Sequence, residues 1–562
     1  MYRFLLISCY IFSFGTSSVI YAQLNQGGFP VSFYAEGIND VFHEVLVSPP
    51  DQKILHAEDV EADKEGLPQR FAVHLPVNLS LQNSGTWSFF NNGSRIWRLK
   101  LRVEYALAVG LHFTDFYLPE GCELFLYDEQ REQVLGAFTN LNNRPGGLFA
   151  TDLMDGEFVI VELFVPEKVN AGFFFNIAEV VYAYRHIGQK PQKGIAGSDF
   201  CEVNINCSPE GDNWQQVKRG VVRIQVKVGG GSYWCTGSLI NNTRNDHTPY
   251  LLTADHCAYQ AGQYASAADL EQWIFRFSHE GAFCESTGPA IGAYSLTGAI
   301  RIAQGGNRGS TGSDFYLVKL IDEIPEDKDV LFLGWSIENI AESSGVTIHH
   351  PDGDIKKIST FTTPLETSGW GGNGLPSHWR VIWSETPNGW GVTEGGSSGS
   401  PLLNDSGRII GTLTGGLAAC EYSGNLGPDK PDFYGKFSYH WLLNGQVDTL
   451  RLKPWLDPDN TGVTTLNGLS GVYAGPPVIV NKAVNIFPNP SGGKFTIDFS
   501  TFVPSDFQVT IYDLKGKAFH HCSIGYTNST IELECNHLSS GIYMIELAST
   551  EVIIMKKLMI VR

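Results

Sequence analysis

Short segments in which apolar and polar residues alternate recur along most of this chain, separated by turns rich in glycine, asparagine and proline. The clearest of these segments are Trp97–Val103, Phe158–Phe164, Phe495–Phe499, Val509–Tyr512 and Ile542–Leu547. A period of two is typical of strands with one face in a core. Aromatic residues suit such pleated surfaces, and glycines suit tight turns. The pattern therefore predicts a mainly β protein.

The segments fall into three predicted units. Residues 23–193 are expected to form a small β-sandwich, and residues 194–470 contain many short strands and frequent glycines. Residues 482–562 form a third β-rich unit, which residues 471–481 link to the second. The stretch His186–Ser198 contains several glycines and a proline, so we expect it to link the first two units.

Length and composition narrow the class of protein. The 562 residues exceed what one core usually holds, and this favours three or four domains. Hydrophobic residues make up 43% of the chain and charged residues only 17%, which excludes a disordered chain. Acidic residues outnumber basic ones by 59 to 39, and the net charge is −20. Because so acidic a chain does not track phosphate backbones, we expect no nucleic-acid partner.

The first 22 residues have the pattern of a signal peptide. Arg3 supplies a positive start, Phe4–Phe14 is an apolar run, and Ala22 is a small residue at the expected cleavage point. The apolar run is too short to serve comfortably as a membrane anchor. We therefore expect an exported protein whose mature chain has no transmembrane segment.

Ten cysteines fit an exported protein, and Cys9 would be removed with the signal peptide. Six of the others are Cys201, Cys207, Cys235, Cys257, Cys284 and Cys420. An even set in an exported segment suggests disulfides. No CxxC spacing indicates structural zinc. The adjacent His349 and His350 do not indicate a metal either, because neighbouring side chains point to opposite faces of a strand.

Three segments of the middle unit contain the residue types of a nucleophilic hydrolase. His256 follows the apolar segment Leu251–Ala254, Asp314 opens an alternating strand, and Ser398 lies in the glycine-rich turn Gly395–Ser400. A serine hydroxyl is a weak nucleophile, so it needs a base to take its proton and a third group to orient that base. We expect Ser398 to be the nucleophile, His256 the base and Asp314 the orienting acid.

The glycines around Ser398 have a further expected role. A tight turn can direct the backbone N–H groups of Gly396 and Ser398 to one point, which makes an oxyanion hole. A serine esterase is an alternative, but its usual chain order is Ser…Asp…His, whereas this chain has His…Asp…Ser. A non-catalytic surface adhesin on a protease scaffold is another alternative, and the complete triad argues against it.

These motifs resemble those of chymotrypsin-fold serine proteases, and in particular those of bacterial lysyl endopeptidases. The similar segments are Cys235–Thr243, Asn245–Asp246, Thr253–Cys257, Ser313–Asp314, Ile348–Pro351, Trp370–Gly372, Val392–Glu394, Gly396–Pro401 and Trp455–Pro458. The resemblance implies two six-stranded antiparallel β-barrels with the active site between them. It also implies peptide-bond hydrolysis through an acyl-enzyme, without a cofactor.

The resemblance implies three disulfides as well. Their pairings are Cys201–Cys420, Cys207–Cys284 and Cys235–Cys257. The last of these would pin the loop that carries the base, because Cys257 adjoins His256. Each bond would stabilise the fold by about 2–4 kcal/mol.

Cleavage on the carboxyl side of lysine is the specificity that the resemblance implies. A cationic side chain in a pocket needs an opposite charge there. The position six residues before the serine, which is acidic in many trypsin-like enzymes, is Val392 here. The resemblance places the acid at Asp432 instead, where it would shorten the pocket and favour an ammonium over a guanidinium group.

The other substrate-binding positions that the resemblance implies are Trp370, Thr414, Gly415 and Gly416. Lysyl endopeptidases of the most similar type carry a histidine at the Thr414 position, stacked on the tryptophan that matches Trp370. Because Thr414 replaces that histidine here, a mixed Lys/Arg specificity stays open as an alternative.

The third unit resembles the type A sorting domains of the type IX secretion system. The similar segments are Phe487–Pro490, Gly492–Gly493, Ile511–Gly516, Leu538–Tyr543 and Lys556–Arg562. The resemblance implies export through the periplasm and outer membrane, with the secretion machinery as a partner. The domain would then be removed or attached to the cell surface. A carbohydrate-binding β-sandwich is the alternative.

The first unit shows no such resemblance, and its position before the protease favours a propeptide. The linker Gln189–Lys193 is polar and contains a proline, so we expect self-cleavage between Lys193 and Gly194. Ser397 stands where many chymotrypsin-like enzymes have the aspartate that pairs with the new N-terminus. Activation is therefore expected to come mainly from removal of a first unit that covers the cleft.

Overall fold

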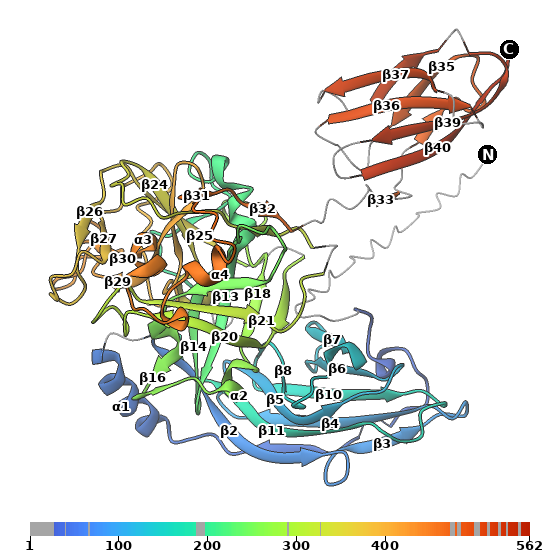
Figure 1. Cartoon of the computed structure of the whole chain (residues 1–562). Helices are drawn as coiled ribbons and strands as arrows, with labels where there is room; N and C mark the ends of the chain where they lie inside the picture. Colours follow the sequence, from blue (N-terminus) through green and yellow to red (C-terminus); the bar gives the residue numbers. More distant parts are fainter. Residues whose placement is uncertain are drawn as a thin grey trace, which may run out of the picture. The chain divides into compact units, whose positions relative to one another are not determined.

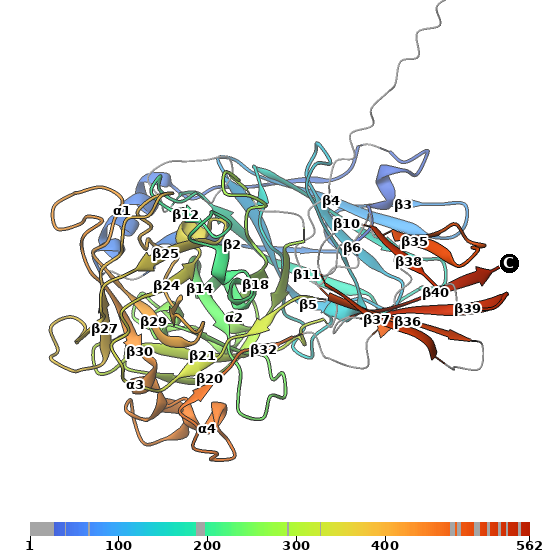
Figure 2. The ribbon, with the colours of Figure 1, turned by 90° about the horizontal axis from the view of Figure 1, so that it is seen from above.

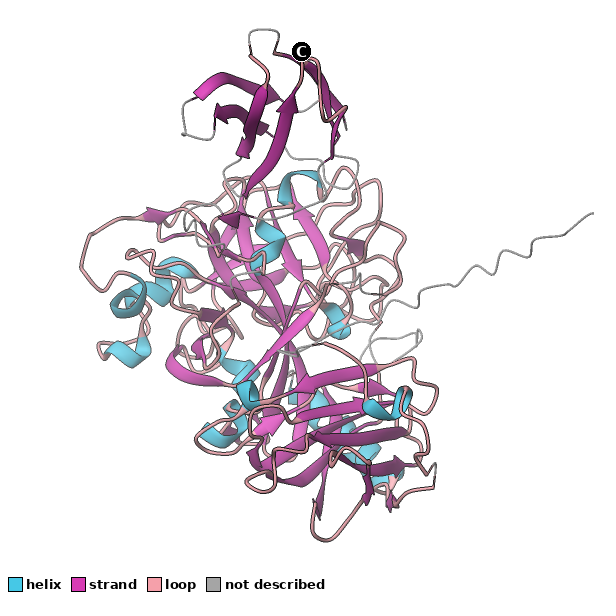
Figure 3. Cartoon of the chain, turned by 90° about the vertical axis from the view of Figure 1, so that its right-hand side faces the viewer, coloured by secondary structure: helices cyan, strands magenta, loops and turns pink. Residues whose placement is uncertain are grey.

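The computed structural model consists mainly of β-strands with a few short helices, as expected from the alternating pattern (Figures 1 and 3). It describes residues 27–39, 41–65, 68–186, 197–288, 292–325, 328–471, 478–479, 485–498, 506–513, 518–525, 530–535, 538–548 and 552–562. The predicted signal peptide, the bond between Lys193 and Gly194, and most of the 471–481 linker lie outside these residues. By its contacts the chain divides into two compact bodies, Met1–Gly471 and Val472–Arg562, and the first body contains the first two predicted units.

The first region is a β-sandwich, as the alternating segments predict. One sheet contains β1 (Glu44–Val47), β3 (Thr86–Phe89), β4 (Arg95–Val103), β6 (Glu123–Tyr127), β7 (Val134–Phe138) and β10 (Phe158–Val165). The other contains β2 (Arg70–Ser80), β5 (Ala108–Tyr117), β8 (Phe149–Ala150), β9 (Met154–Asp155) and β11 (Phe174–Ala183). Inward residues of both sheets, such as Trp97 and Phe113, form one buried core. Helix α1 (Gln52–Ala62) precedes β2 and is capped by the Asp51 side chain.

The first barrel follows. Its strands are β13 (Val221–Val228), β14 (Gly231–Leu239), β15 (Tyr250–Thr253), β18 (Ile274–Phe277), β19 (Tyr294–Thr297), β20 (Ala299–Gly305) and β21 (Phe315–Leu320). They pair in the order β18–β13–β14–β15–β21–β20, and β19 pairs with β18. Only Gly298, at φ +86°, separates β19 from β20. The pairing therefore runs through this glycine and closes a barrel of six strands, with β19 and β20 counted as one.

The second barrel closes in a similar way. Its strands are β24 (Gly345–His349), β25 (Lys357–Phe361), β27 (His378–Val381), β28 (Pro401–Asn404), β29 (Ile409–Gly416) and β30 (Asp432–Lys436). They pair in the order β25–β24–β28–β29–β30–β27. The backbone N–H of Ser384, just after β27, donates to the carbonyl of Thr360 in β25 (2.8 Å). The double β-barrel implied by the family resemblance is therefore present.

The remaining elements of this region are short. They are α2 (Ala267–Leu270), α3 (Phe437–Leu442), α4 (Lys453–Leu456), β12 (Val203–Asn204), β16 (Tyr259–Gln260), β17 (Gln263–Tyr264), β22 (Leu331–Phe332), β23 (Trp335–Ser336), β26 (Glu366–Ser368), β31 (Thr465–Leu466) and β32 (Leu469–Ser470). Strand β2 of the sandwich pairs with β14 of the first barrel, so one sheet continues across both (Figures 1 and 2).

The C-terminal unit, drawn in red in Figure 1, has two sheets. One contains β33 (Val478–Ile479), β36 (Asp506–Asp513), β37 (Ala518–Gly525), β39 (Gly541–Ala548) and β40 (Val552–Ile560). The other contains β34 (Asn485–Phe487), β35 (Lys494–Asp498) and β38 (Thr530–Glu534). Buried residues of both sheets, including Phe495 and Ile511, form one core. In the parts of the chain that the structure describes, no helix is long and apolar enough to span a membrane.

Candidate active site

His256 and Asp314 are both positioned by the first barrel. Strand β15 ends just before the turn that carries His256, and Asp314 immediately precedes β21, which pairs with β15. His256 Nδ1 lies 2.7 Å from Asp314 Oδ2, and the His256 backbone N–H donates to Oδ1 at 3.0 Å. Both side chains are buried. Two contacts on one carboxylate therefore fix the orientation of the imidazole ring.

The surroundings of Asp314 keep it ionised. Burial by itself would raise the pKa of Asp314, but His256 and its hydrogen bonds hold that pKa below its ordinary value. The hydroxyl of Thr414 also donates to the carboxylate. An ionised Asp314 can accept a hydrogen bond from Nδ1 of His256, which leaves Nε2 on the opposite side of the ring.

Ser398 lies beside the loop that carries His256. Its carbonyl oxygen accepts a hydrogen bond from the backbone N–H of Thr236 (2.8 Å) and is 3.7 Å from Cys257 Sγ. A disulfide joins Cys257, the residue after His256, to Cys235 in β14. The other two disulfides join Cys201 to Cys420 and Cys207 to Cys284, so all three pairings are those implied by the resemblance.

The turn before Ser398 contains a glycine with a positive φ. Gly396 has φ +92°, and a Cβ there would lie 2.8 Å from the carbonyl oxygen of His350. Its own carbonyl accepts a hydrogen bond from the Thr236 hydroxyl (2.9 Å). Within the described part of the chain, the backbone N–H groups of Gly396 and Ser398 have no hydrogen-bond partner. Both donors are thus available to an oxyanion.

Asp432 lies at the start of β30, between β27 and β29. Its Oδ2 accepts hydrogen bonds from Trp383 Nε1 and Thr393 Oγ1, both at 2.7 Å, and its Oδ1 accepts one from the backbone N–H of Ala418 (3.2 Å). Burial raises the pKa of Asp432 to about 6, although these donors oppose the shift. No described cationic side chain pairs with it. Asp432 is therefore a buried carboxylate with neutral partners alone.

Two glycines leave space beside Asp432. A Cβ on Gly416 would lie 2.0 Å from Asp432 Oδ1, and a Cβ on Gly415 would lie 3.2 Å from the ring of Trp370. Any side chain at position 416 would collide with the carboxylate. The structure thus brings together Asp432, Gly415, Gly416 and Trp370 from separate segments.

A residue that sequence reasoning missed, His378, lies between Thr414 and Trp370. Its Nε2 is 3.1 Å from Thr414 Oγ1, and its ring centroid is 6.2 Å from that of Trp370, tilted by 30°. Burial lowers the pKa of His378 to about 4, so the ring is neutral. A neutral His378 can donate to Thr414 while Thr414 donates to Asp314. The chain thus supplies a histidine next to Trp370 from a different strand than position 414.

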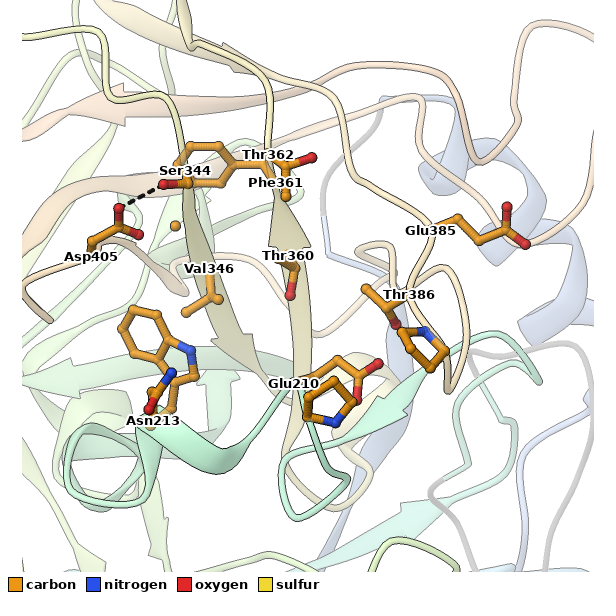
Figure 4. Close-up of a pocket in the computed structure, with 14 residues that line it drawn as sticks. Glu210, Asn213, Ser344, Val346, Thr360, Phe361, Thr362, Glu385, Thr386 and Asp405 are labelled. Atoms are coloured by element: carbon orange, nitrogen blue, oxygen red, sulfur yellow. Dashed lines mark hydrogen bonds between the residues drawn. The ribbon is translucent and has the colours of Figure 1, made fainter.

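The pocket in Figure 4 is a separate feature of the second barrel. It has a volume of about 350 Å³ and lies over β24 and β25. One of its polar groups, the Ser344 hydroxyl, donates a hydrogen bond to Asp405 at 2.6 Å. Its lining includes neither the triad residues nor Asp432, so it is not part of the candidate active site.

Comparison with known proteins identifies both C-terminal regions. Residues 195–435 match a family model described as lysyl endopeptidase, C-terminal domain. The protein is a serine protease whose residues 195–435 are similar to the C-terminal domain of lysyl endopeptidases. Residues 485–561 of this protease match a secretion system C-terminal sorting domain, so the protein is exported by the type IX route to the outer membrane or cell surface.

Two relatives are similar to the protease over much of their length. Lysyl endopeptidase of Pseudomonas aeruginosa is 29% identical over 408 residues, which cover 70% of this chain and 84% of that one. Secreted RxLR effector protein 73 of Plasmopara viticola is 24% identical over 335 residues, 54% of this chain and 73% of that one.

Solved structures of proteases are also similar to part of the chain. Protease Anisep from Arthrobacter nicotinovorans is 14% identical, with a TM-score of 0.27 over 39% of this chain and 90% of that one. A Glu endopeptidase is 16% identical, with a TM-score of 0.25 over 42% of this chain and 87% of that one.

Proposed function

We propose that this serine endopeptidase cleaves peptide bonds on the carboxyl side of lysine, with Ser398, His256 and Asp314 as its catalytic triad. The observation that carries the specificity is the buried carboxylate of Asp432, which has only neutral partners among the described residues. The observation that supports the triad is the pair of contacts between His256 and Asp314.

In the proposed reaction, Ser398 Oγ attacks the scissile carbonyl while His256 Nε2 takes its proton. Asp314 holds the ring and stabilises its positive charge. The N–H groups of Gly396 and Ser398 bind the oxyanion, and His256 returns the proton to the leaving amine. Water then hydrolyses the acyl-enzyme by the same steps, so the reaction needs no cofactor.

The hydrogen bonds of Asp432 favour lysine over arginine. A carboxylate has about four lone-pair positions, and neutral donors of this chain occupy three of them. A guanidinium group binds best through two parallel N–H bonds to both oxygens, whereas an ammonium group can use one position. One open position therefore suits lysine. Trp370 beside Gly415 offers an apolar surface for the aliphatic part of the lysine side chain.

We also propose that the protease processes itself between Lys193 and Gly194. This bond presents the lysine that the Asp432 pocket would accept, so processing and specificity agree. The described contacts of the first unit with the rest of the chain involve the first barrel and the segments next to it, and none reaches the triad or Asp432. We therefore do not propose that the first unit covers the cleft.

Ser398→Ala tests the nucleophile. We expect kcat to fall by about 10⁶-fold and labelling by an organophosphonate to disappear. Ser406→Ala, at an exposed position in the turn between β28 and β29, is the matched control and should keep both properties. More than about a thousandth of the activity remaining in Ser398→Ala would require another nucleophile.

Peptides that differ only in the residue before the cleaved bond test the specificity. We expect lysine to be preferred over arginine, and both over an uncharged residue. Equal rates for lysine and arginine would contradict the proposed lysine specificity and favour the mixed alternative, without affecting the triad. Sequencing the N-terminus of the secreted enzyme checks the cut after Lys193.

A further inference from the structure

The first unit contacts the outer face of the first barrel through main-chain hydrogen bonds. In the β2–β14 pair, Val73 lies opposite Gly231 and Ala72 lies opposite Ser232. The His74 backbone N–H also donates to the carbonyl of Gly230 (2.9 Å). Without the first unit, this end of β14 would become an unpaired strand edge, which is costly or prone to new pairing.

Aromatic packing reinforces this strand pair. Phe71 of β2 stacks on Trp234 of β14, with ring centroids 4.1 Å apart and planes 8° apart. Both side chains are fully buried, in a cluster that also contains Val181 from β11. Separation of the two regions would expose these apolar surfaces to water.

Ion pairs of both polarities cross the same interface. Asp152 of the first unit pairs with Arg276 and lies 3.7 Å from Arg223, both in the first barrel. In another pair the charges are reversed, because the basic residue, Arg144, belongs to the first unit and the acidic one, Asp322, belongs to the protease. Such buried pairs specify one partner, because each charge lacks its counterion when the partner is absent.

A fourth group of contacts includes two buried histidines of the first unit. His112 Nδ1 lies 2.8 Å from Glu179 Oε2, and the His74 and His112 rings are 4.8 Å apart. Lys227 of β13 inserts its ammonium group here, where it donates to Glu179 and lies 3.2 Å from His112 Nδ1. It also donates to Gln272 of the protease at 2.8 Å.

Each ring nitrogen of His74 already has a neutral partner. Nδ1 faces the carbonyl of Gly229 at 3.1 Å, and Nε2 faces the hydroxyl of Ser232 at 2.8 Å. The charged groups that act on the two histidines are Lys227, Glu179 and the more distant Asp269. Burial disfavours a positive charge on either ring, and Lys227 adds to this effect although Glu179 opposes it, so the closed interface holds both rings neutral.

We infer that the first unit stays bound to the protease after the linker is cut, and that protonation of His74 and His112 releases it in acid. The inference depends on the proposed processing only in so far as that processing makes the cut in nature. The occupant of the docking surface on the protease is the first unit of the same chain. The docking surface on the protease includes Lys227, Ser232, Trp234, Gln272 and Arg276.

The sign of the pH effect follows from the two histidines. Burial, together with Lys227, lowers the pKa of His112 to about 4 and that of His74 well below its ordinary value. After separation both rings face water and regain a pKa of about 6.5. The free first unit therefore binds more protons, and binding weakens as pH falls below that value.

The expected change is large enough to measure. Between pH 7.5 and 5.5 each histidine should raise the dissociation constant about tenfold, and both together about 100-fold. Glu179 and Asp152 do not contribute in this window, because their pKa values are lowered in the complex and free carboxylates titrate near about 4.

The test uses the full chain with Ser398→Ala, which prevents self-cleavage, and with a site for an unrelated protease in the 187–196 linker. After the cut, we expect the first unit to co-elute with the protease in size-exclusion chromatography at pH 7.5 and to separate at pH 5.5. Because the cut is external, the result does not depend on the proposed catalytic residues or on lysine specificity.

Three variants assign the effect to the histidines. His74→Asn/His112→Asn keeps an amide donor near each Nδ1 but cannot titrate, so the pH dependence should disappear. Lys227→Met removes the charge that opposes ring protonation, so the pH dependence should shrink with both histidines present. His56→Asn replaces an exposed histidine of α1 and should keep the 100-fold change.

Several outcomes would overturn the inference. One is separation of the cut first unit at pH 7.5 and micromolar concentration. Another is an unchanged dissociation constant between pH 7.5 and 5.5, or an unchanged pH dependence in Lys227→Met, which serves if the double variant does not fold. Because His74, His112 and Glu179 have the spacing of metal ligands, release by a chelator at pH 7.5 would instead identify a metal site.

Discussion

Two buried carboxylates, Asp314 in the first barrel and Asp432 in the second, differ in their electrostatic surroundings. Asp314 in the first barrel is 0% exposed, and Asp432 in the second is 1% exposed. Burial disfavours the charge on both. The pKa of Asp314 is nevertheless below its ordinary value, whereas that of Asp432 is raised to about 6. Since burial is the same, the difference comes from the partners.

Asp314 has a partner that can become positive, the imidazole of His256, and the chain itself supplies it. Asp432 has an indole N–H, a hydroxyl and an amide N–H, which stabilise an anion without neutralising it. The protein itself thus supplies Asp314 with a partner that can carry a positive charge, whereas Asp432 can gain a counterion only from a bound molecule. In the proposed function the first carboxylate serves catalysis and the second serves recognition, and each role can be tested separately.

Of the two carboxylate variants, Asp314→Asn is expected to have the larger effect. The amide would donate to His256 rather than accept from it, which favours the wrong tautomer, and kcat should fall about 10⁴-fold. The loss should be equal for a substrate with lysine and for one with norleucine, an uncharged residue of similar length. Asp429→Asn, at a half-exposed aspartate paired with Lys430, is the control. A loss limited to the lysine substrate would erase the contrast between the two carboxylates.

Asp432→Asn should change recognition instead of chemistry. Loss of the pocket charge should lower kcat/KM for the lysine substrate by about 10²- to 10³-fold, because the substrate ammonium would be buried without a counterion. The norleucine substrate should change by no more than a few-fold. Steady-state kinetics with the two peptides measure both values. Retention of full lysine preference would remove Asp432 from the pocket assignment.

A smaller effect is expected from pH in the unmodified enzyme. Protonation of Asp432 removes the charge that a lysine needs, so lysine binding should weaken as pH falls through about 6. The ratio of kcat/KM for the lysine and norleucine substrates should fall about tenfold per pH unit below that value. Any group that acts in the chemical step affects both substrates equally and cancels in the ratio. A ratio that stays constant in the unmodified enzyme, or that still falls in Asp432→Asn, would contradict the assignment.

Local patterns predicted much of this molecule. Alternating residues placed the strands, because side chains on a strand point to opposite faces in turn wherever the strand lies. Strand-end positions and chain order pointed to His256, Asp314 and Ser398, and the family resemblance supplied the double barrel, Asp432 and the three disulfide pairings. His378 was missed because its contacts with Thr414 and Trp370 depend on how β27, β29 and the loop between β26 and β27 meet.

The sequence by itself determined the β-rich character and the chain order of the proposed triad residues, since these follow from residue type and local spacing. Only the tertiary structure decided the electrostatics. Whether a buried carboxylate faces an imidazole, as Asp314 does, or neutral donors, as Asp432 does, depends on which distant strands close each barrel. The tertiary structure also decided which face of the protease the first unit contacts. Strand pairing and buried ion pairs there join residues more than a hundred positions apart, which meet only in the folded chain.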